Sequence, residues 1–265
     1  MSEILRANNV SMVFGGLTAV DNVSLTMEDN EILSMIGPNG AGKTTFFNML
    51  TGVYRPTTGN IIFMGEDITH LKAHQRVAKG ISRTFQNIRL FHDMTALENL
   101  LVAHPACNQE NLARVLFGGK KLKLQRQAIV EECEEILEIV GLKDKEGELA
   151  TNLPYGKQRL LEIGRALATN PKLVLLDEPG AGMNSVEKEE LTALIRHMTQ
   201  KMEKKVLLIE HDMKFVMGIS DRILVLDHGE LIANGIPQEI QSNPQVIEAY
   251  LGKGIVDEDD EGEDS

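Results

Sequence analysis

The sequence predicts an α/β fold with a mixed sheet core, an antiparallel β subdomain and a helical subdomain, and three observations predict it. A glycine-rich loop, residues 37–42, directly follows an apolar strand-like run and opens into a helix-like segment from Thr44. A second apolar run, residues 173–176, ends in two carboxylates, which is typical of a buried parallel strand that delivers acidic groups to a site. Between these two runs, residues 88–165 are rich in helix-like sequence.

The elements can be placed along the chain from the period of their apolar residues. Residues 1–29 and about 59–65 alternate apolar and polar side chains, which predicts antiparallel strands. A stripe of apolar residues predicts a helix in which Cys133 is a core residue: Ile129, Cys133, Ile136, Leu137 and Val140. Strands of the central sheet are expected near residues 32–36, 81–85, 173–176, 206–209 and 223–226, with helices such as 185–203 covering them.

Composition limits the class of protein. A chain of 265 residues with 42% hydrophobic content can bury a full α/β core as one domain with a subdomain. Its longest apolar runs are far shorter than the roughly 20 residues of a membrane span, and residues 1–6 lack a signal-peptide pattern, so we expect a soluble chain. Cys107 and Cys133 lie far apart without metal-like spacing, which favours reduced cytosolic thiols.

The formal charge of −12 comes largely from one segment. Residues 257–264 contain seven carboxylates, and the residues before them carry 32 acidic against 27 basic groups. We therefore expect a folded domain over residues 1–254 and an acidic disordered tail over 255–265, which either keeps the chain in solution or contacts a basic partner. No basic patch with interleaved aromatic residues appears, so nucleic-acid binding is not expected.

The loop at residues 37–45 is predicted to bind the phosphates of a nucleotide. Its glycines let successive backbone N–H groups turn toward a phosphate chain, and the helix that follows presents its positive dipole end to the same anion. We expect the Lys43 ammonium to reach the β- and γ-phosphates and the Thr44 hydroxyl to bind Mg²⁺. An ordinary strand-to-helix turn is the alternative, but it would not require glycines, lysine and threonine in this register. The expected binding residues are Gly37, Pro38, Asn39, Gly40, Ala41, Gly42, Lys43, Thr44 and Thr45.

Asp177 and Glu178 follow the second apolar run and are predicted to act on the same nucleotide. Asp177 is placed to hold Mg²⁺ through water, and Glu178 to polarise an attacking water as general base. A solvated strand end is the alternative for an acidic pair that stands alone.

Further short motifs follow in a fixed order, and with them the chain resembles the ATP-binding subunit of an ABC transporter over residues 4–252. The resemblance implies ATP and Mg²⁺ as ligands, with Phe14 stacking on adenine. It also implies that Gln86, in Arg83-Thr-Phe-Gln86, binds the metal and senses the membrane subunits, and that His211, in Glu210-His-Asp212, contacts the γ-phosphate. A buried core histidine is the alternative for His211.

Asn152-Leu-Pro-Tyr-Gly156-Lys-Gln158-Arg159 matches the family's signature loop. The resemblance implies that Tyr155 and Gly156, at a helix N-terminus, form a second phosphate cradle that faces the ATP of another subunit. Partners are then a second ATPase subunit, copy or paralogue, in a head-to-tail dimer, two membrane permease subunits, and indirectly a solute-binding protein. The expected location is peripheral, on the cytoplasmic face of the inner membrane.

Two positions depart from the commonest family pattern. Pro154 replaces the signature serine, and Asn184 stands where the following loop usually has aspartate. They suggest either a nucleotide-binding regulatory subunit without turnover or a sequence variant that is typical of one subfamily. The motifs that contain Pro154 and Asn184 resemble those of the ATPases of branched-chain amino-acid importers, as do Arg89-Leu-Phe91 and Ile209 to Met213. Other ABC ATPases, serving lipid or glycan export, urea or amide import, cluster assembly or DNA repair, remain alternatives.

Two segments are expected at the surface. Residues 88–94 present Leu90, Phe91 and Met94, which either form a groove that receives a short permease helix or pack the helical subdomain. His104 to Arg126 is predicted as an irregular surface excursion, which alternatively touches a membrane subunit or lipid headgroups.

Overall fold

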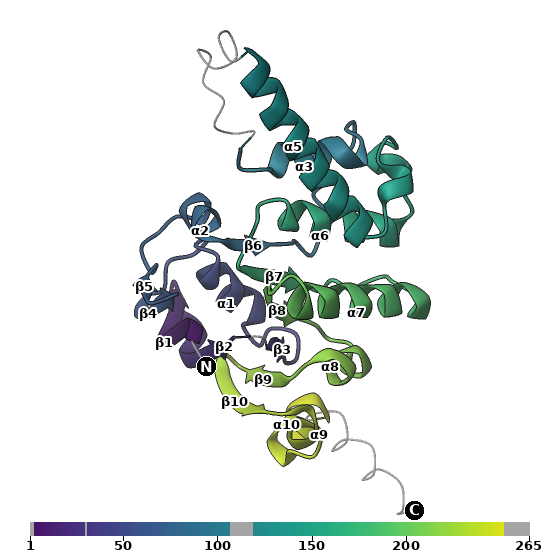
Figure 1. Ribbon diagram of the computed structural model, residues 1–265. Helices are drawn as coiled ribbons and strands as arrows, with labels where there is room; N and C mark the ends of the chain where they lie inside the picture. The colour runs from purple at the N-terminus through teal and green to yellow at the C-terminus, as the bar shows by residue number, and fades with distance from the viewer. Residues whose placement is uncertain (1–2, 30, 107–118, 252–265) are drawn as a thin grey trace, which may run out of the picture. The chain divides into compact units, whose positions relative to one another are not determined.

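The computed structural model describes residues 3–29, 31–106 and 119–251. Its contacts divide the chain into two units, one of residues 1–70 with 209–265 and one of residues 71–208. Figure 1 shows the course of the chain through both. Within the described residues no helix is long and apolar enough to cross a membrane.

The first unit combines an antiparallel sheet with strands of the mixed central sheet. Strand order in the antiparallel sheet is β2-β1-β4-β5, and Leu5 pairs with both Met27 and Phe63. In the central sheet β10 pairs antiparallel with β9, and β9 pairs parallel with β3. The elements are β1 (Glu3–Phe14), β2 (Leu17–Glu28), β3 (Ile32–Ile36), α1 (Lys43–Leu50), β4 (Thr58–Phe63), β5 (Glu66–Asp67), α8 (Met213–Ile219), β9 (Arg222–Asp227), β10 (Glu230–Gly235), α9 (Pro237–Gln241) and α10 (Pro244–Leu251).

In the second unit, strands β6, β7 and β8 are separated along the chain by helices. β6 and β7 pair in parallel, with Arg83 opposite Leu175, and the strand order is β8-β7-β6. All residues of β7 are buried, as its continuous apolar run predicted. The elements are α2 (Ala73–Lys79), β6 (Ile81–Arg83), α3 (Ala96–Ala103), α5 (Gly119–Ile139), η2 (Lys143–Lys145), η3 (Ala150–Asn152), α6 (Tyr155–Leu167), β7 (Leu173–Asp177), α7 (Ser185–Gln200) and β8 (Lys205–Ile209).

The predicted fold class is confirmed, since mixed and antiparallel sheets are both present and every element of three or more residues described between 88 and 165 is helical. Cys133 is fully buried on α5, as its stripe predicted. α5 begins at Gly119, so residues 119–126 of the predicted irregular excursion from 104 to 126 are helical, and residues 107–118 of it lie outside the described residues. Cys107 and the acidic tail lie outside the described residues.

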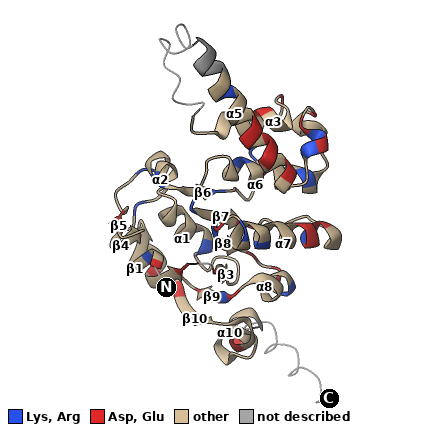
Figure 2. Cartoon of the chain, viewed as in Figure 1, with Lys and Arg blue, Asp and Glu red and all other residues tan. Residues whose placement is uncertain are grey.

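Acidic residues gather along the second half of α5 (Figure 2). Carboxylates near a helix C-terminus oppose the helix dipole, so cations nearby are favourable. Lys143, just after the helix, donates to Glu134 at 2.6 Å and to Glu146 at 2.9 Å. These hydrogen bonds raise the pKa of Lys143, although all three side chains are largely solvated and the pairs are weak.

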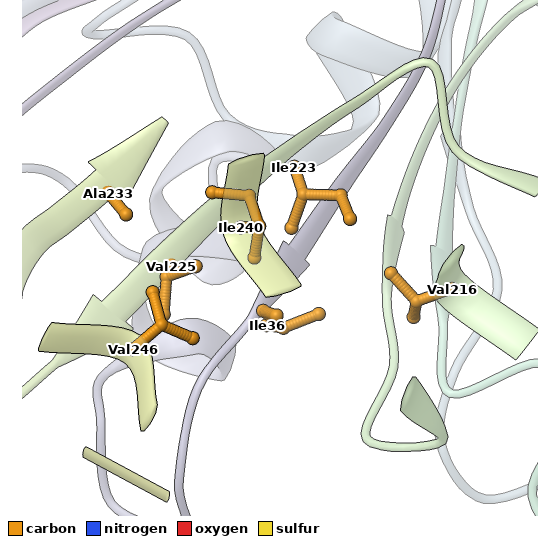
Figure 3. Packing of buried hydrophobic residues seen from close by; sticks show 7 residues of the cluster. All are labelled: Ile36, Val216, Ile223, Val225, Ala233, Ile240 and Val246. Carbon is orange, nitrogen blue, oxygen red and sulfur yellow. The ribbon is translucent and has the colours of Figure 1, made fainter. Parts of the chain in front are cut away.

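A buried apolar cluster in the first unit supports the end of β3. Figure 3 shows Ile36, the last residue of β3, among side chains of β9, β10 and the three C-terminal helices. Ile240 of α9 and Val246 of α10 are 2% and 4% exposed, so these short helices are held by the core and not by their own length. The segment that begins at Gly37 is thereby anchored on its strand side. The cluster consists of Ile36, Val216, Ile223, Val225, Ala233, Ile240 and Val246.

Candidate functional site

The loop between β3 and α1 has the backbone that a phosphate cradle requires. Gly37 has a φ of 151°, and a Cβ there would lie 2.1 Å from the Leu226 carbonyl oxygen. Gly42 has a φ of 97°, and a Cβ there would lie 2.4 Å from the Ala19 carbonyl oxygen. Only glycine meets both demands, so glycine is required at both positions of the loop that leads into the N-terminus of α1.

Lys43 is the first residue of α1 and its side chain folds back over the loop. Its Nζ donates to the carbonyl oxygens of Gly37 at 2.7 Å and Pro38 at 2.9 Å, and the residue is 8% exposed. A buried ammonium at the positive end of a helix is electrostatically suited to an anion, and the cradle therefore fits a polyphosphate. Thr44 is exposed beside it and Thr45 is half-buried.

The C-terminal helix α10 reaches this loop. The Gly37 backbone forms a hydrogen bond with Tyr250, and burial raises the pKa of that tyrosine to about 12 against the opposing effect of the bond. A cavity of about 580 Å³ borders Pro38–Ala41 and is lined as well by His228 and by Glu248 of α10.

Phe14 ends β1 and is 41% exposed, which leaves a ring face for stacking. Its ring meets that of Tyr54 edge-on, with centroids 5.3 Å apart. Tyr54 was not predicted to take part, because a lone tyrosine after a helix carries no motif. The pair offers a rigid aromatic surface of the kind that an adenine base stacks on.

The second unit brings Gln86 and Glu178 together. β6 and β7 are parallel neighbours, so their carboxyl ends lie at the same edge, and the residues that follow them meet there. Gln86 Nε2 donates to Glu178 Oε2 at 3.1 Å. Glu178 has a φ of 48°, which is uncommon for a residue with a side chain and is a form of strain that clusters at functional sites.

Asp177 is buried and paired with an arginine that the sequence did not single out. Arg83 Nη2 donates to Asp177 Oδ2 at 2.6 Å, with side chains 9% and 4% exposed. The Asp177 N–H also donates to the Thr84 hydroxyl at 3.3 Å. Among the described residues no group of three or more His, Cys, Asp and Glu side chains could hold a metal ion.

The signature loop leads into α6, whose N-cap is Pro154 and whose first residue is Tyr155. The Tyr155 hydroxyl accepts from Arg159 Nη2 at 3.0 Å and Nε at 3.2 Å. Its ring lies against Gly182, where an added Cβ would sit 2.9 Å from the ring, yet Tyr155 remains 47% exposed. Proline at this N-cap position costs no helical hydrogen bond, so Pro154 is compatible with the helix start.

Asn184 has a structural role that accounts for its departure from the family pattern. It caps α7, where its side chain accepts from the Glu187 N–H at 3.0 Å while Glu187 Oε2 accepts from the Asn184 N–H at 2.9 Å. Asparagine and aspartate cap helices about equally well, so the exchange preserves this reciprocal pair.

We expect Asn184→Ala to lower the free energy of unfolding by about 1 kcal/mol, because a helix cap is lost. Asn184→Asp is the matched control and keeps the acceptor. Urea denaturation of the two variants measures the difference. Equal stability of the alanine and aspartate variants would contradict the capping role.

His211 follows β8, and its side chain is 61% exposed. The His211 backbone N–H donates to the carboxylate of Glu210, a residue that is 1% exposed, at 3.2 Å. The alternative of a buried core histidine is therefore wrong, and the imidazole is accessible to a ligand. Asp212 caps α8 by accepting from the Phe215 N–H at 3.1 Å.

The segment after Gln86 differs in part from the prediction. Phe91 is 45% exposed and Met94 is half-buried, but Leu90 is 6% exposed and belongs to the core. Asn99, fully buried on α3, accepts from the Phe91 N–H at 2.9 Å and donates to its carbonyl oxygen at 3.1 Å. These two bonds with Asn99 fix the backbone of Phe91. Its exposed ring lies beside Arg165, whose guanidinium carbon is 5.7 Å from the ring centroid.

The α/β fold and the glycine-rich loop between β3 and α1 define a P-loop nucleotide-binding protein. The ABC transporter family profile matches residues 20–181, and a profile described as branched-chain amino acid ATP-binding cassette transporter matches residues 230–255. The chain therefore belongs to the ABC transporter family.

Similar proteins cover nearly the whole chain. The high-affinity branched-chain amino acid transport ATP-binding protein BraF of Pseudomonas aeruginosa is 48% identical, over 94% of this chain and 98% of its own length. LivG of Escherichia coli K12, of the same description, is 46% identical with the same coverage. The crystal structure of a nucleotide-free ATP-binding cassette from an ABC transporter is 34% identical with a TM-score of 0.83, covering 95% of this chain and 100% of that one.

Proposed function

We propose that this chain is the ATP-hydrolysing subunit of an importer of branched-chain amino acids. The observation that carries the proposal is the match of residues 230–255 to the branched-chain profile. The described part of this segment, residues 230–251, contains β10, α9 and α10; all three pack in the cluster around Ile36, and Tyr250 of α10 bonds the Gly37 backbone. The branch-specific part of the chain thus supports the nucleotide site itself, and the 46–48% identity to BraF and LivG agrees with it.

The proposed reaction is transfer of the γ-phosphoryl group of ATP to water. Lys43 and the loop N–H groups hold the phosphates and neutralise charge that develops during transfer. Glu178 accepts the proton of the attacking water, and its contact with Gln86 fixes the orientation of the carboxylate. His211 completes the shell around the γ-phosphate, and Phe14 binds the base.

The residues that would hold Mg²⁺ are Thr44, Gln86 and Asp177. A hydroxyl, an amide and a carboxylate are the oxygen donors that this ion takes together with phosphates, and when bound it neutralises negative charge on them. The Arg83 guanidinium donates to Asp177 Oδ2 at 2.6 Å, so one carboxylate oxygen is held by protein.

The proposed assembly is a head-to-tail dimer in which Tyr155 and Gly156 face the ATP of a second ATPase subunit, copy or paralogue. Two permease subunits bind the dimer at the cytoplasmic face of the membrane, and a solute-binding protein acts through them. Pro154 and Asn184 occupy helix-cap positions, and this supports an active branch over a subunit without turnover.

Phe91 is the proposed contact for a permease helix, because it is an exposed ring on a fixed backbone. We expect Phe91→Glu to abolish association with the permeases while ATP binding stays within about twofold, since an exposed substitution away from the phosphate loop changes stability little. Co-purification with the permeases measures the first effect and nucleotide titration the second. Val77→Glu, at an apolar residue of similar exposure (42%) on α2, is the control and should still associate. A Phe91→Glu chain that still co-purifies would contradict the contact.

Reconstitution tests the function. The chain, its proposed permease subunits and a solute-binding protein are placed in proteoliposomes, and uptake of labelled leucine, isoleucine, valine and urea is followed with internal ATP. We expect ATP-dependent uptake of the branched-chain amino acids and none with Glu178→Gln. Uptake of urea alone would overturn the substrate class. Uptake without ATP hydrolysis would overturn the enzymatic role.

A further inference from the structure

Helix α6 carries two buried charged residues to which neither the family resemblance nor the proposed reaction assigns a role. Arg159 is 4% exposed and Glu162 is 2% exposed. They stand three residues apart on one face of the helix, with Arg159 Nη1 3.5 Å from Glu162 Oε2. Burying an ion pair is rarely a net gain in stability, so a pair retained in this place calls for another explanation.

Both side chains bind the backbone of the segment that contains Gln86. Arg159 Nη1 donates to the Phe85 carbonyl oxygen at 2.9 Å, and Nη2 donates to the Gln86 carbonyl oxygen. Glu162 Oε1 accepts from the N–H groups of Phe85 at 3.4 Å and Arg89 at 3.3 Å. Residues 84–91 form no helix or strand, so these side chains replace the partners that secondary structure would supply.

The same guanidinium also reaches the signature loop. Arg159 Nη2 and Nε both donate to the Tyr155 hydroxyl, at 3.0 and 3.2 Å, while its other bonds end on residues 85 and 86. The planar fork of arginine presents several donors in fixed directions, which the single ammonium of lysine does not. One side chain therefore connects Tyr155, which is proposed to face the partner's ATP, with the backbone of Gln86.

We propose that Arg159 and Glu162 form a clamp, the α6 clamp, that fixes the backbone of residues 85–89 and so directs the Gln86 amide toward Glu178. The two are positioning residues, since neither lies on reacting atoms, and the proposal rests on the roles assigned above to Gln86 and Glu178. Through Arg159 the clamp also makes the signature loop and the Gln86 segment move as one body.

The electrostatics agree with a clamp. Burial raises the pKa of Glu162, while the Arg89 and Phe85 N–H groups and the Arg159 charge act against that rise. The carboxylate is thus held by the segment that it binds. Arg89 and Arg83 lie over the Phe85 ring at 4.5 and 5.5 Å from its centroid, which further limits the freedom of this segment.

The test is a double-mutant cycle in steady-state ATP hydrolysis by the full chain assembled with its partner subunits. Arg159→Lys keeps the charge but cannot bond all three acceptors, so we expect kcat to fall about tenfold while Kd for ATP stays within about twofold. In a Gln86→Ala background, Arg159→Lys is expected to change kcat by less than about twofold, because its effect passes through Gln86. Arg196→Lys, the same replacement at an exposed position of α7, is the control and should leave kcat unchanged.

Glu162 provides the second arm and is decisive if Arg159→Lys does not fold. Glu162→Gln keeps an oxygen for the Phe85 and Arg89 N–H groups but turns an amide N–H toward Arg159, so we expect a fall in kcat of about threefold, again absent in the Gln86→Ala background. If the fold-changes in kcat of a clamp variant and of Gln86→Ala simply multiply in the double variant, the clamp proposal is overturned, while the roles assigned to Gln86 and Glu178 still stand. If Gln86→Ala itself leaves kcat unchanged, the proposed role of Gln86 fails and the clamp fails with it.

Discussion

Replacing Lys43 by alanine is expected to reduce kcat/KM for ATP about 100-fold or more, because a charge-assisted contact to phosphate is worth up to about 3 kcal/mol. The Lys43 ammonium lies over the loop, where it also donates to the carbonyl oxygens of Gly37 and Pro38. Its loss leaves a cradle of N–H groups without a mobile cation. Steady-state hydrolysis and the thermal shift caused by Mg-ATP together measure the change.

The fold is expected to survive this substitution. Ile36 and the C-terminal helices anchor the loop from the strand side, and glycine adopts the positive φ found at positions 37 and 42 without strain. Lys201→Ala, at an exposed residue after α7, is the control for removal of a lysine and should keep full activity. A folded Lys43→Ala chain that hydrolyses ATP normally would end the assignment of the phosphate loop.

The site residues that the sequence predicted belong to local patterns. A glycine loop between an apolar strand and a helix, or two carboxylates after four apolar residues, can be recognised within about ten residues because the chain itself sets their geometry. The adjacency of Gln86 and Glu178 was not predicted, although both come after strands expected in one sheet. What the sequence could not supply was that β6 and β7 are direct neighbours.

The missed residues are single charges whose partners lie far along the chain. Arg83 pairs with Asp177 across 94 positions, and Arg159 binds carbonyl oxygens more than 70 positions away. Isolated arginines and glutamates are usually solvated, so the residue type alone does not indicate a buried role. A signal did exist in α6, because Arg159 and Glu162 share the helix face that continues to Ile163 and Ala166, both buried. Charge inside an apolar stripe is therefore worth reading as a sign of a buried polar contact.

Leu90 and the short C-terminal helices show a different limit. Leu90, beside exposed Phe91, is buried, and this alternation depends on how Asn99 holds the turn from α3. α9 and α10 have five and eight residues, too few for an apolar period to be distinctive. Their place is set by packing on Ile36 and Val225, which are distant in sequence.

Glu178→Gln is expected to lower kcat by a factor of about 10² to 10⁴, the usual contribution of general base catalysis, while Mg-ATP binding is retained. Glutamine has nearly the same shape as glutamate, and its amide oxygen can still accept from Gln86 Nε2, now 3.1 Å from the carboxylate. The bound ATP then persists, and the dimer that it closes accumulates. Size-exclusion chromatography with ATP detects this dimer.

Asp177→Asn distinguishes the two neighbouring carboxylates, because the structure gives Asp177 a second role. The substitution removes the negative charge opposite the buried Arg83, and breaking a buried pair in this way costs about 3 to 5 kcal/mol of unfolding free energy. We therefore expect Asp177→Asn to be less stable and to bind ATP with a weaker dependence on Mg²⁺, whereas Glu178→Gln keeps wild-type stability. Normal turnover by Glu178→Gln would contradict its role as general base. Dimers that trap ATP with Asp177→Asn and not with Glu178→Gln would exchange the roles assigned to the two residues.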